Sequence, residues 1–144
     1  IQLVAAGKLP GIPPGRASWC HVREVARAHV AAADRGRAGG VYALSCVEAS
    51  YGEFVSEVAA ATGGRVPRAL PAPALRAYAR VLSLGAALTG RAPEVTPEGV
   101  AITCKRVTLD SALAQRELGY RPSTLREMVA DCVAWMRAEG LLES

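Results

Sequence analysis

The sequence predicts an α/β protein of the helix-rich α+β type, with several helices and about three short strands. Stretches with apolar residues at helical spacing are bounded by capping residues, glycines and prolines. Between them lie three short apolar runs, at residues 17–22, 41–45 and 106–109. Because helices separate these runs, they are typical of strands in a parallel sheet. A chain of 144 residues, 51% of them hydrophobic, is expected to form a single domain over 1–144.

The N-terminal part of the chain supplies the first helices of this pattern. Residues 1–6 predict the last turns of a helix that Gly7 closes. A loop with three prolines and two glycines follows at residues 8–15. Beyond the strand at 17–22, an amphipathic helix is expected to end near Gly36. Its predicted apolar face consists of Val22, Val25, Ala26, His29, Val30 and Ala33.

Capping residues mark the helices in the middle of the chain. Ser50-Tyr-Gly-Glu53 matches a capping box, and Gly63-Gly64 marks the end of the helix that it begins. A linker at 67–73 contains prolines and leads into an apolar stretch that predicts a helix over about 74–88. Thr96-Pro97-Glu98 combines a threonine cap with proline at the first helical position, so another helix starts there.

Two further helices are predicted at the C-terminal end. Asp110 or Ser111 can cap a short helix, which Gly119 then stops. A longer helix begins at Ser123 or Thr124. Its apolar stripe, which we expect to pack in the core, consists of Leu125, Met128, Val129, Cys132, Val133 and Met136.

Composition excludes several classes of protein. The high apolar content argues against disorder. The net charge is +4, but the arginines are scattered and no basic run alternates with aromatic residues, so no nucleic-acid partner is expected. No window of about 20 uncharged apolar residues is present, so we expect no transmembrane segment. No signal peptide is recognised either.

The four cysteines predict no metal site. Cys20, Cys46, Cys104 and Cys132 form no CxxC pair, and neither histidine stands at zinc-finger spacing from them. Each lies in an apolar stretch. We therefore expect free, buried thiols and a reducing, cytoplasmic location.

Six motifs in order along the chain resemble one family. They are Gly7–Gly15, Trp19-Cys-His-Val-Arg-Glu-Val-Ala-Arg-Ala-His29, Gly40-Val-Tyr-Ala-Leu-Ser45, Thr89–Pro93, Thr96–Val100 and Leu118-Gly-Tyr-Arg-Pro122. Together they resemble the C-terminal portion of extended short-chain dehydrogenases/reductases, the NAD-dependent epimerase/dehydratase family. The nearest likeness is to dihydroflavonol-reductase-like proteins and hopanoid-associated sugar epimerases. The resemblance implies the C-terminal part of an extended Rossmann-type fold.

The resemblance also implies chemistry that this chain does not carry. Such enzymes bind NAD or NADP at a glycine-rich GxxGxxG turn and use a Tyr-x-x-x-Lys pair for proton transfer. The chain has no such turn, and none of its tyrosines has lysine four residues later. We therefore expect no catalytic or cofactor-binding residue here, and no activity or cofactor binding by the chain alone. Its expected partners are a small-molecule substrate and either its own N-terminal cofactor-binding half or a second copy.

The loop at 8–15 and the strand after it hold the candidate substrate-binding residues. These are Leu9, Pro10, Ile12, Pro13, Arg16, Trp19 and His21. A proline-rich loop is already ordered and can shape a pocket at little entropic cost, although it can also be a plain connection. Trp19 either lines that pocket or packs in the core. His21 and His29 are expected to be structural histidines.

Arg16 bears on the kind of substrate. Its guanidinium suits an anionic group. In nucleotide-sugar epimerases, however, an arginine four residues before the histidine of this strand pairs with the diphosphate, and here that position is Ala17. A one-residue shift in a strand reverses the side-chain direction, which favours a reductase-like substrate. Arg23-Glu24 also departs from the two acids usual in the family.

Two questions stay open at this stage. The helix over 74–88 is apolar on more than one side, so it is a buried helix between domains, a lid over an apolar substrate, or a membrane-surface helix. The resemblance implies the substrate-binding portion of an NAD(P)-dependent oxidoreductase or epimerase/dehydratase. The alternative is a non-catalytic binding or protein-interaction module derived from this family.

Overall fold

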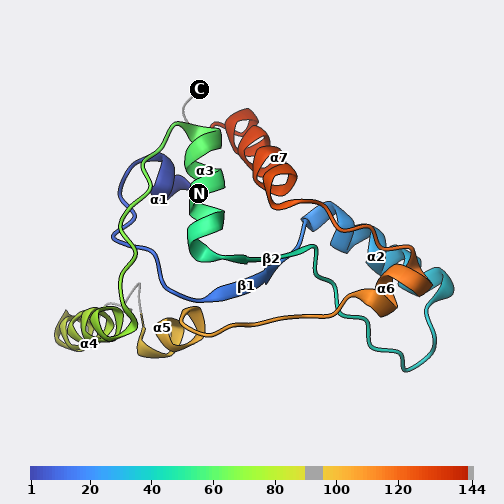
Figure 1. Ribbon diagram of the computed structural model, residues 1–144, viewed down its shortest axis with the longest axis horizontal. Coiled ribbons are helices and arrows are strands. Elements are labelled where there is room, and N and C mark those ends of the chain that lie inside the picture. The colour runs from blue at the N-terminus through green and yellow to red at the C-terminus, as the bar shows by residue number, and fades with distance from the viewer. Residues whose placement is uncertain (90–95, 143–144) are drawn as a thin grey trace.

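The computed structural model describes residues 1–89 and 96–142, and so leaves out residues 90–93 of the Thr89–Pro93 motif. Within these ranges the chain forms seven helices and a two-stranded sheet (Figure 1). In chain order the elements are α1 (Gln2–Ala5), β1 (Arg16–Trp19), α2 (Val22–Arg35), β2 (Val47–Ser50), α3 (Tyr51–Thr62), α4 (Ala72–Thr89), α5 (Pro97–Thr103), α6 (Ala112–Leu118) and α7 (Leu125–Ala138). The predicted helix-rich α+β fold is confirmed.

The predicted capping signals set the helix boundaries. Ser50 Oγ accepts from the backbone N–H of Glu53, and the Glu53 carboxylate accepts from the N–H of Ser50, so the capping box starts α3. Gly63 ends α3 in the left-handed conformation, with φ of 71°. Thr124 starts α7 through the same reciprocal arrangement with Glu127. Thr96 caps α5, as expected.

The sheet differs from the prediction in its direction. β1 and β2 pair antiparallel, in a register that joins Arg16 to Ser50 and Trp19 to Val47, whereas parallel pairing was expected. Figure 1 shows the reason: α2 extends away from the end of β1 instead of folding back over it. The returning chain therefore meets β1 from the opposite direction.

Two of the three predicted strands are wrong. Residues 41–45 form no strand, and β2 begins only at Val47. The side chains of Tyr42 and Leu44 pack instead between α2 and α6. The predicted strand at 106–109 is reduced to one parallel bridge between Arg16 and Arg106, because only the backbone groups of residues 105 and 107 reach β1.

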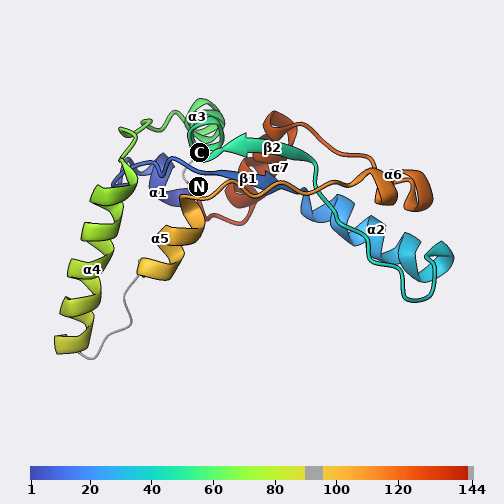
Figure 2. The ribbon, with the colours of Figure 1, turned by 60° about the horizontal axis from the view of Figure 1, so that its bottom comes forward.

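Three separate apolar clusters hold the described residues together. The largest joins α1, the loop before β1, α3 and α7, and it includes the predicted α7 stripe through Val129 and Val133. A second lies between α2 and α6, around Ala28 and Leu118. The third joins α4 to α5. Figures 1 and 2 show the resulting shape, in which α2–α6 and α4–α5 project as two arms on either side of the central sheet, α3 and α7.

The buried side of α2 is not the predicted one. Ala28 is buried at the contact with α6, and Val25, Ala31 and Ala32 lie beside it, half-buried. On the opposite side, Val22 is 76% exposed and Val30 64% exposed. The sequence pattern identified an apolar face correctly, but no described residue of this chain covers it.

Two other expectations concern the surface. All four cysteines are free, as predicted, but the expected burial is wrong for Cys20, which is exposed, and the other three are half-buried. Across residues 1–89 and 96–142, none of the helices has the combination of length and apolar content needed to cross a bilayer.

Candidate substrate-binding site

The loop before β1 is held in place by its backbone and its apolar side chains. Ile12 forms a parallel bridge with Ala69, with its N–H donating to Arg68 O at 3.1 Å. The Ile12 side chain is buried in the largest cluster, and Leu9 packs against the same cluster. Pro10 is exposed and Pro13 half-buried. Leu9 and Ile12 therefore anchor the loop, while Pro10 and Pro14 stay exposed.

Arg16 is engaged by the start of α3. Its Nη1 lies 3.1 Å from Glu53 Oε2, and its Nη2 donates to Glu48 O at 3.0 Å. Hydrogen bonds from the Ser50 hydroxyl and backbone N–H lower the pKa of Glu53, and Arg16 lowers it further. Arg16 thus ties β1 to the capping box, and its guanidinium is committed to partners within the chain.

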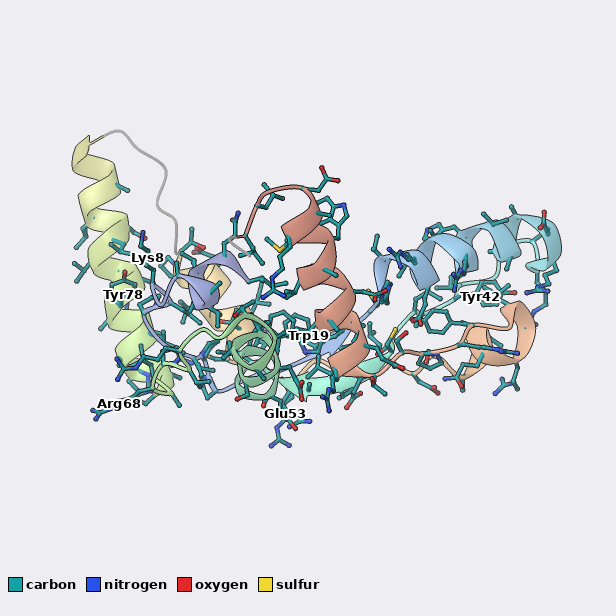
Figure 3. All side chains as sticks on the ribbon, turned by 90° about the horizontal axis from the view of Figure 1, so that it is seen from above. Lys8, Trp19, Tyr42, Glu53, Arg68 and Tyr78 are labelled. Carbon is teal, nitrogen blue, oxygen red and sulfur yellow. The ribbon has the colours of Figure 1, made fainter. Side chains whose placement is uncertain are left out.

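Trp19 packs against α3. Its ring stacks on Phe54 at 4.0 Å between centroids, with an interplanar angle of 1°, and meets Tyr51 edge-on at 5.7 Å. Its Nε1 donates to Ala49 O at 3.2 Å. Figure 3 shows Trp19 at the centre of the molecule, beside α3 and α7. These contacts give Trp19 a packing role between the sheet and α3.

His21 joins the start of α2 to α7. Its Nδ1 accepts from the backbone N–H of Arg23 at 3.1 Å and so caps α2. Its Nε2 lies 3.1 Å from Asp131 Oδ2, which also accepts from the Arg23 guanidinium. Since Nδ1 must keep its lone pair, the proton of the neutral ring resides on Nε2 and points at the carboxylate. Both ring nitrogens are therefore occupied, as expected of a structural histidine.

An open groove with a volume of about 580 Å³ lies beside His21, between the start of α2 and α7. Its walls are mainly apolar, from Val22, Met128 and Trp135, and Cys20 and Cys132 also line it. Trp135 is 53% exposed. Of the seven predicted site residues, only His21 lines this groove, and Leu9 lines a different hollow, near Arg65. The chain by itself does not gather these seven side chains around one cavity.

A polar cluster centred on Glu24 was not predicted from the sequence. The Cys46 thiol donates to Glu24 Oε2 at 2.7 Å and lies 3.0 Å from the Tyr120 hydroxyl, while Ser123 donates to Glu24 through both its hydroxyl and its backbone N–H. Burial opposes ionisation of Glu24, but the hydrogen bonds from Cys46 and Ser123 outweigh it and lower its pKa. The sequence signals for this position were an acid in the first turn of a helix and its place in the Arg23-Glu24 pair, where the family usually has two acids.

This cluster links three segments and is unsuited to nucleophilic catalysis. Burial raises the pKa of the Cys46 thiol, and its hydrogen bond to the Glu24 carboxylate raises it further. Burial also raises the pKa of Tyr120, and the hydrogen bond to Cys46 adds to the effect. A thiol and a phenol that stay protonated at neutral pH are poor nucleophiles and bases. The cluster therefore fixes the start of α2 against the segment between α6 and α7.

The glycine-rich segment near residues 36–40 lacks the geometry of a dinucleotide turn. A pyrophosphate site needs a glycine turn that leads into a helix N-terminus. The glycines near residues 36–40 do the reverse, since Gly36 caps the end of α2 and no helix follows before β2. In the described part of the chain, no group of three or more histidine, cysteine or acidic side chains is placed to hold a metal ion.

No protein-family model matches the chain. Among curated proteins, it is 28% identical over 128 residues to a putative dihydroflavonol 4-reductase of Synechocystis, a match that covers 85% of this chain and 37% of that protein. It is 26% identical over 141 residues to sterol demethylase protein B of Methylococcus capsulatus, a match that covers 96% of this chain and 43% of the relative.

The chain also resembles solved structures. The chain superposes on the crystal structure of gox2253 with a TM-score of 0.75 and 31% identity, covering 99% of this chain and 43% of that one. A UDP-glucose-4-epimerase from Stenotrophomonas maltophila with bound NAD and formylated UDP-arabinopyranose gives a TM-score of 0.61 and 25% identity, covering 98% of this chain and 39% of that one. The predicted resemblance to dihydroflavonol-reductase-like and Rossmann-type epimerase proteins is confirmed. The chain spans between 37% and 43% of the length of these proteins.

Proposed function

We propose that this chain is the C-terminal, substrate-binding portion of an NAD(P)-dependent oxidoreductase or epimerase/dehydratase that acts on a carbonyl or hydroxyl carbon. The chain matches a putative reductase over 85% of its length and an epimerase over 98%, while spanning 37% and 39% of those proteins, and this observation carries the proposal. The cofactor site and the catalytic tyrosine and lysine then belong to an N-terminal portion. Four free cysteines suit a reducing compartment such as the cytoplasm.

The role of this portion in such an enzyme is to bind and orient the substrate. A bound cofactor supplies hydride transfer, and the chain holds the substrate carbon where that transfer can occur. The exposed prolines of loop 8–15, Pro10 among them, are the surface available for contact, because Leu9 and Ile12 hold the loop from below. Among the seven predicted substrate-binding residues, Pro10 is therefore a candidate for direct contact, and Leu9 and Ile12 hold the loop that presents it.

The contacts of Arg16 favour a reductase-like substrate over a nucleotide sugar. Its guanidinium is committed to Glu53 and to the carbonyl of Glu48, and recruiting it to a diphosphate would break both interactions. The curated relatives carry names for enzymes of dihydroflavonols and sterols, both ring-rich molecules of low charge. We therefore place ring-rich ketones or alcohols ahead of UDP-sugars as substrates.

Calorimetric titration with NAD⁺ and NADP⁺ tests this proposal. The complete protein, in which this chain follows its N-terminal portion, should bind one of the two cofactors with one-to-one stoichiometry, and the chain alone should bind neither. Nicotinamide absorbance then follows turnover with panels of cyclic ketones and of UDP-sugars. One-to-one micromolar binding by the chain alone would contradict the proposal. A complete protein that binds no cofactor would favour the non-catalytic binding module.

A further inference from the structure

Helix α4 is apolar on two sides, and α5 covers only one of them. Leu75 and Ala79 are buried at the contact with α5. At about 100° per residue, a second set of apolar side chains lies together on the outer side of the helix. This outer stripe consists of Ala74, Ala77, Tyr78, Val81 and Leu84, all of them exposed. Val81 and Leu84 are 67% and 69% exposed, so the largest apolar groups of the stripe face solvent.

The position of α4 bears on the three roles that the sequence left open for it. The helix projects from the centre of the molecule as an arm, with α5 packed beside it (Figure 2). A buried helix or a substrate lid accounts for the side that α5 covers. It does not account for the outer stripe, and contiguous exposed apolar groups of this kind mark an interaction surface.

The net charge of the chain is concentrated beside this stripe. Residues 63–89 contain no acidic residue and four arginines, namely Arg65, Arg68, Arg76 and Arg80. This excess equals the net charge of the whole chain, +4, so the basic and acidic residues elsewhere balance one another. Within the part of the chain that the structure describes, none of these four guanidinium groups forms an ion pair. The arm therefore presents unpaired positive charge together with apolar surface.

Two of the arginines border the outer stripe directly. Around the helix, Arg80 and Arg76 follow Leu84 and separate the stripe from the buried side. Arginine lays its methylene groups along an apolar surface and extends its charge to the edge of that surface. Figure 3 shows Arg68 close to the start of α4 and Tyr78 further along the helix. An apolar stripe with a basic border, on a helix of 18 residues, is typical of a helix that lies in the plane of a membrane surface.

We propose that α4 is a membrane-surface anchor. Its outer stripe enters the head-group layer of a bilayer that contains anionic lipids, and Arg68, Arg76 and Arg80 contact the lipid phosphates. The helix lies along the surface and does not cross it, in keeping with its limited apolar content. This inference assigns a partner to α4 and does not depend on the proposed function.

Charge complementarity favours an anionic lipid surface over the other occupants of the stripe. A second copy of the chain would bring two sets of unpaired guanidinium groups together, and these repel one another. A nucleic acid would neutralise the arginines but would leave the valine and leucine side chains in water. A bilayer with anionic lipids satisfies both, and each arginine close to its surface strengthens partitioning about fivefold.

Sedimentation of the complete protein with lipid vesicles tests the anchor. Vesicles of phosphatidylcholine with phosphatidylserine should carry the protein into the pellet, and added salt should weaken the binding. The double variant Val81→Ser/Leu84→Ser should lower the partition coefficient about tenfold or more, because two apolar side chains no longer enter the bilayer. The double variant Arg76→Gln/Arg80→Gln should lower it about 25-fold on these vesicles. On vesicles of phosphatidylcholine alone, the arginine variant should bind as the unmodified protein does.

A matched control separates the anchor from the overall charge. Arg116 and Arg126 are exposed residues of α6 and α7, and neither forms an ion pair with any described residue. The double variant Arg116→Gln/Arg126→Gln removes the same charge and should change the partition coefficient by less than about twofold, because these arginines lie away from the arm. Circular dichroism of each variant checks that its fold is intact.

Each other outcome overturns the anchor. Equal losses for the two arginine pairs, or unchanged binding by the serine variant, would make the attraction a diffuse effect of net charge. If the unmodified protein does not sediment with the vesicles, a lower melting temperature of the serine variant would assign the stripe to a contact inside the complete protein. A dimer that the serine variant splits would assign the stripe to a second copy. Cofactor titration without vesicles is the separate check on the proposed function, so a protein that binds NAD(P) but no vesicles keeps the function and loses the anchor.

Discussion

Trp19 offers the sharpest test of how this chain is held together. Trp19→Ala removes the stack on Phe54, the edge contact with Tyr51 and the Nε1 hydrogen bond to Ala49 O. Truncating a buried tryptophan costs about 3–5 kcal/mol. Because Trp19 is half-buried, we expect the lower end, about 3 kcal/mol, to which the two aromatic pairs contribute about 0.5–1.5 kcal/mol each. Trp19→Phe keeps a ring against Phe54 and should lose only about 1–1.5 kcal/mol, mainly the hydrogen bond.

Urea unfolding followed by far-ultraviolet circular dichroism measures these losses by linear extrapolation. Trp135, the second of the two tryptophans, remains in both variants and reports on α7 through its fluorescence. A loss below about 0.5 kcal/mol for Trp19→Ala would refute the packing role. If that small loss came with a reduced kcat/KM in the complete protein, Trp19 would instead be a substrate contact, as one reading of the sequence allowed.

Two further predictions concern charged groups. Glu24→Gln should cost about 1–3 kcal/mol, because the cluster with Cys46 and Ser123 loses its charged acceptor. Since folding lowers the Glu24 pKa below its ordinary value of 4.5, its stabilisation is complete above that pH and is lost as the pH falls through the lowered value. Acid titration of unfolding should therefore be flatter below pH 4.5 for Glu24→Gln, and parallel curves would contradict the assignment. Arg16→Ala should change stability by less than about 1 kcal/mol, since its ion pair with Glu53 is exposed. A fall in kcat/KM of the complete protein equivalent to about 1.5–3 kcal/mol would show that Arg16 also meets the substrate.

Local signals in the sequence predicted the helices well. Ser50 with Glu53, Thr96 and Thr124 with Glu127 start helices as expected, because a cap depends only on residues three or four positions apart. Gly63 and Gly119 end helices for the same local reason. Their positive φ angles are a property of glycine itself.

The strands were predicted less well because pairing depends on distant partners. Val41-Tyr-Ala-Leu has the composition of a strand, yet none of the described segments offers it a backbone edge. The direction of the sheet follows from the course of α2, which no local pattern encodes. The same limit explains α2, whose one predicted apolar face is largely exposed, whereas the side that is covered, around Ala28, was not predicted.

Several residues that were predicted to bind substrate make contacts within the chain. Ile12, Trp19 and His21 are each engaged with the core, α3 or α7. The residues around Glu24 were missed because Cys46, Tyr120 and Ser123 come from distant segments. The contribution of Ile12, Trp19 and His21 to substrate binding stays a prediction for the complete protein.

The division of the described core into three clusters has a consequence for cooperativity. The α1–α3–α7, α2–α6 and α4–α5 clusters are joined mainly through a ribbon of two short strands and the chain beside it. Domains lose their structure in one step when a single continuous core couples all parts, and cores joined by narrow connections open independently. Amide exchange in the isolated chain should therefore resolve three groups of residues with different opening free energies, the two arms opening before the centre. A partner bound against α2 would couple the α2–α6 cluster to the other two clusters. The complete protein should therefore unfold more cooperatively than the isolated chain.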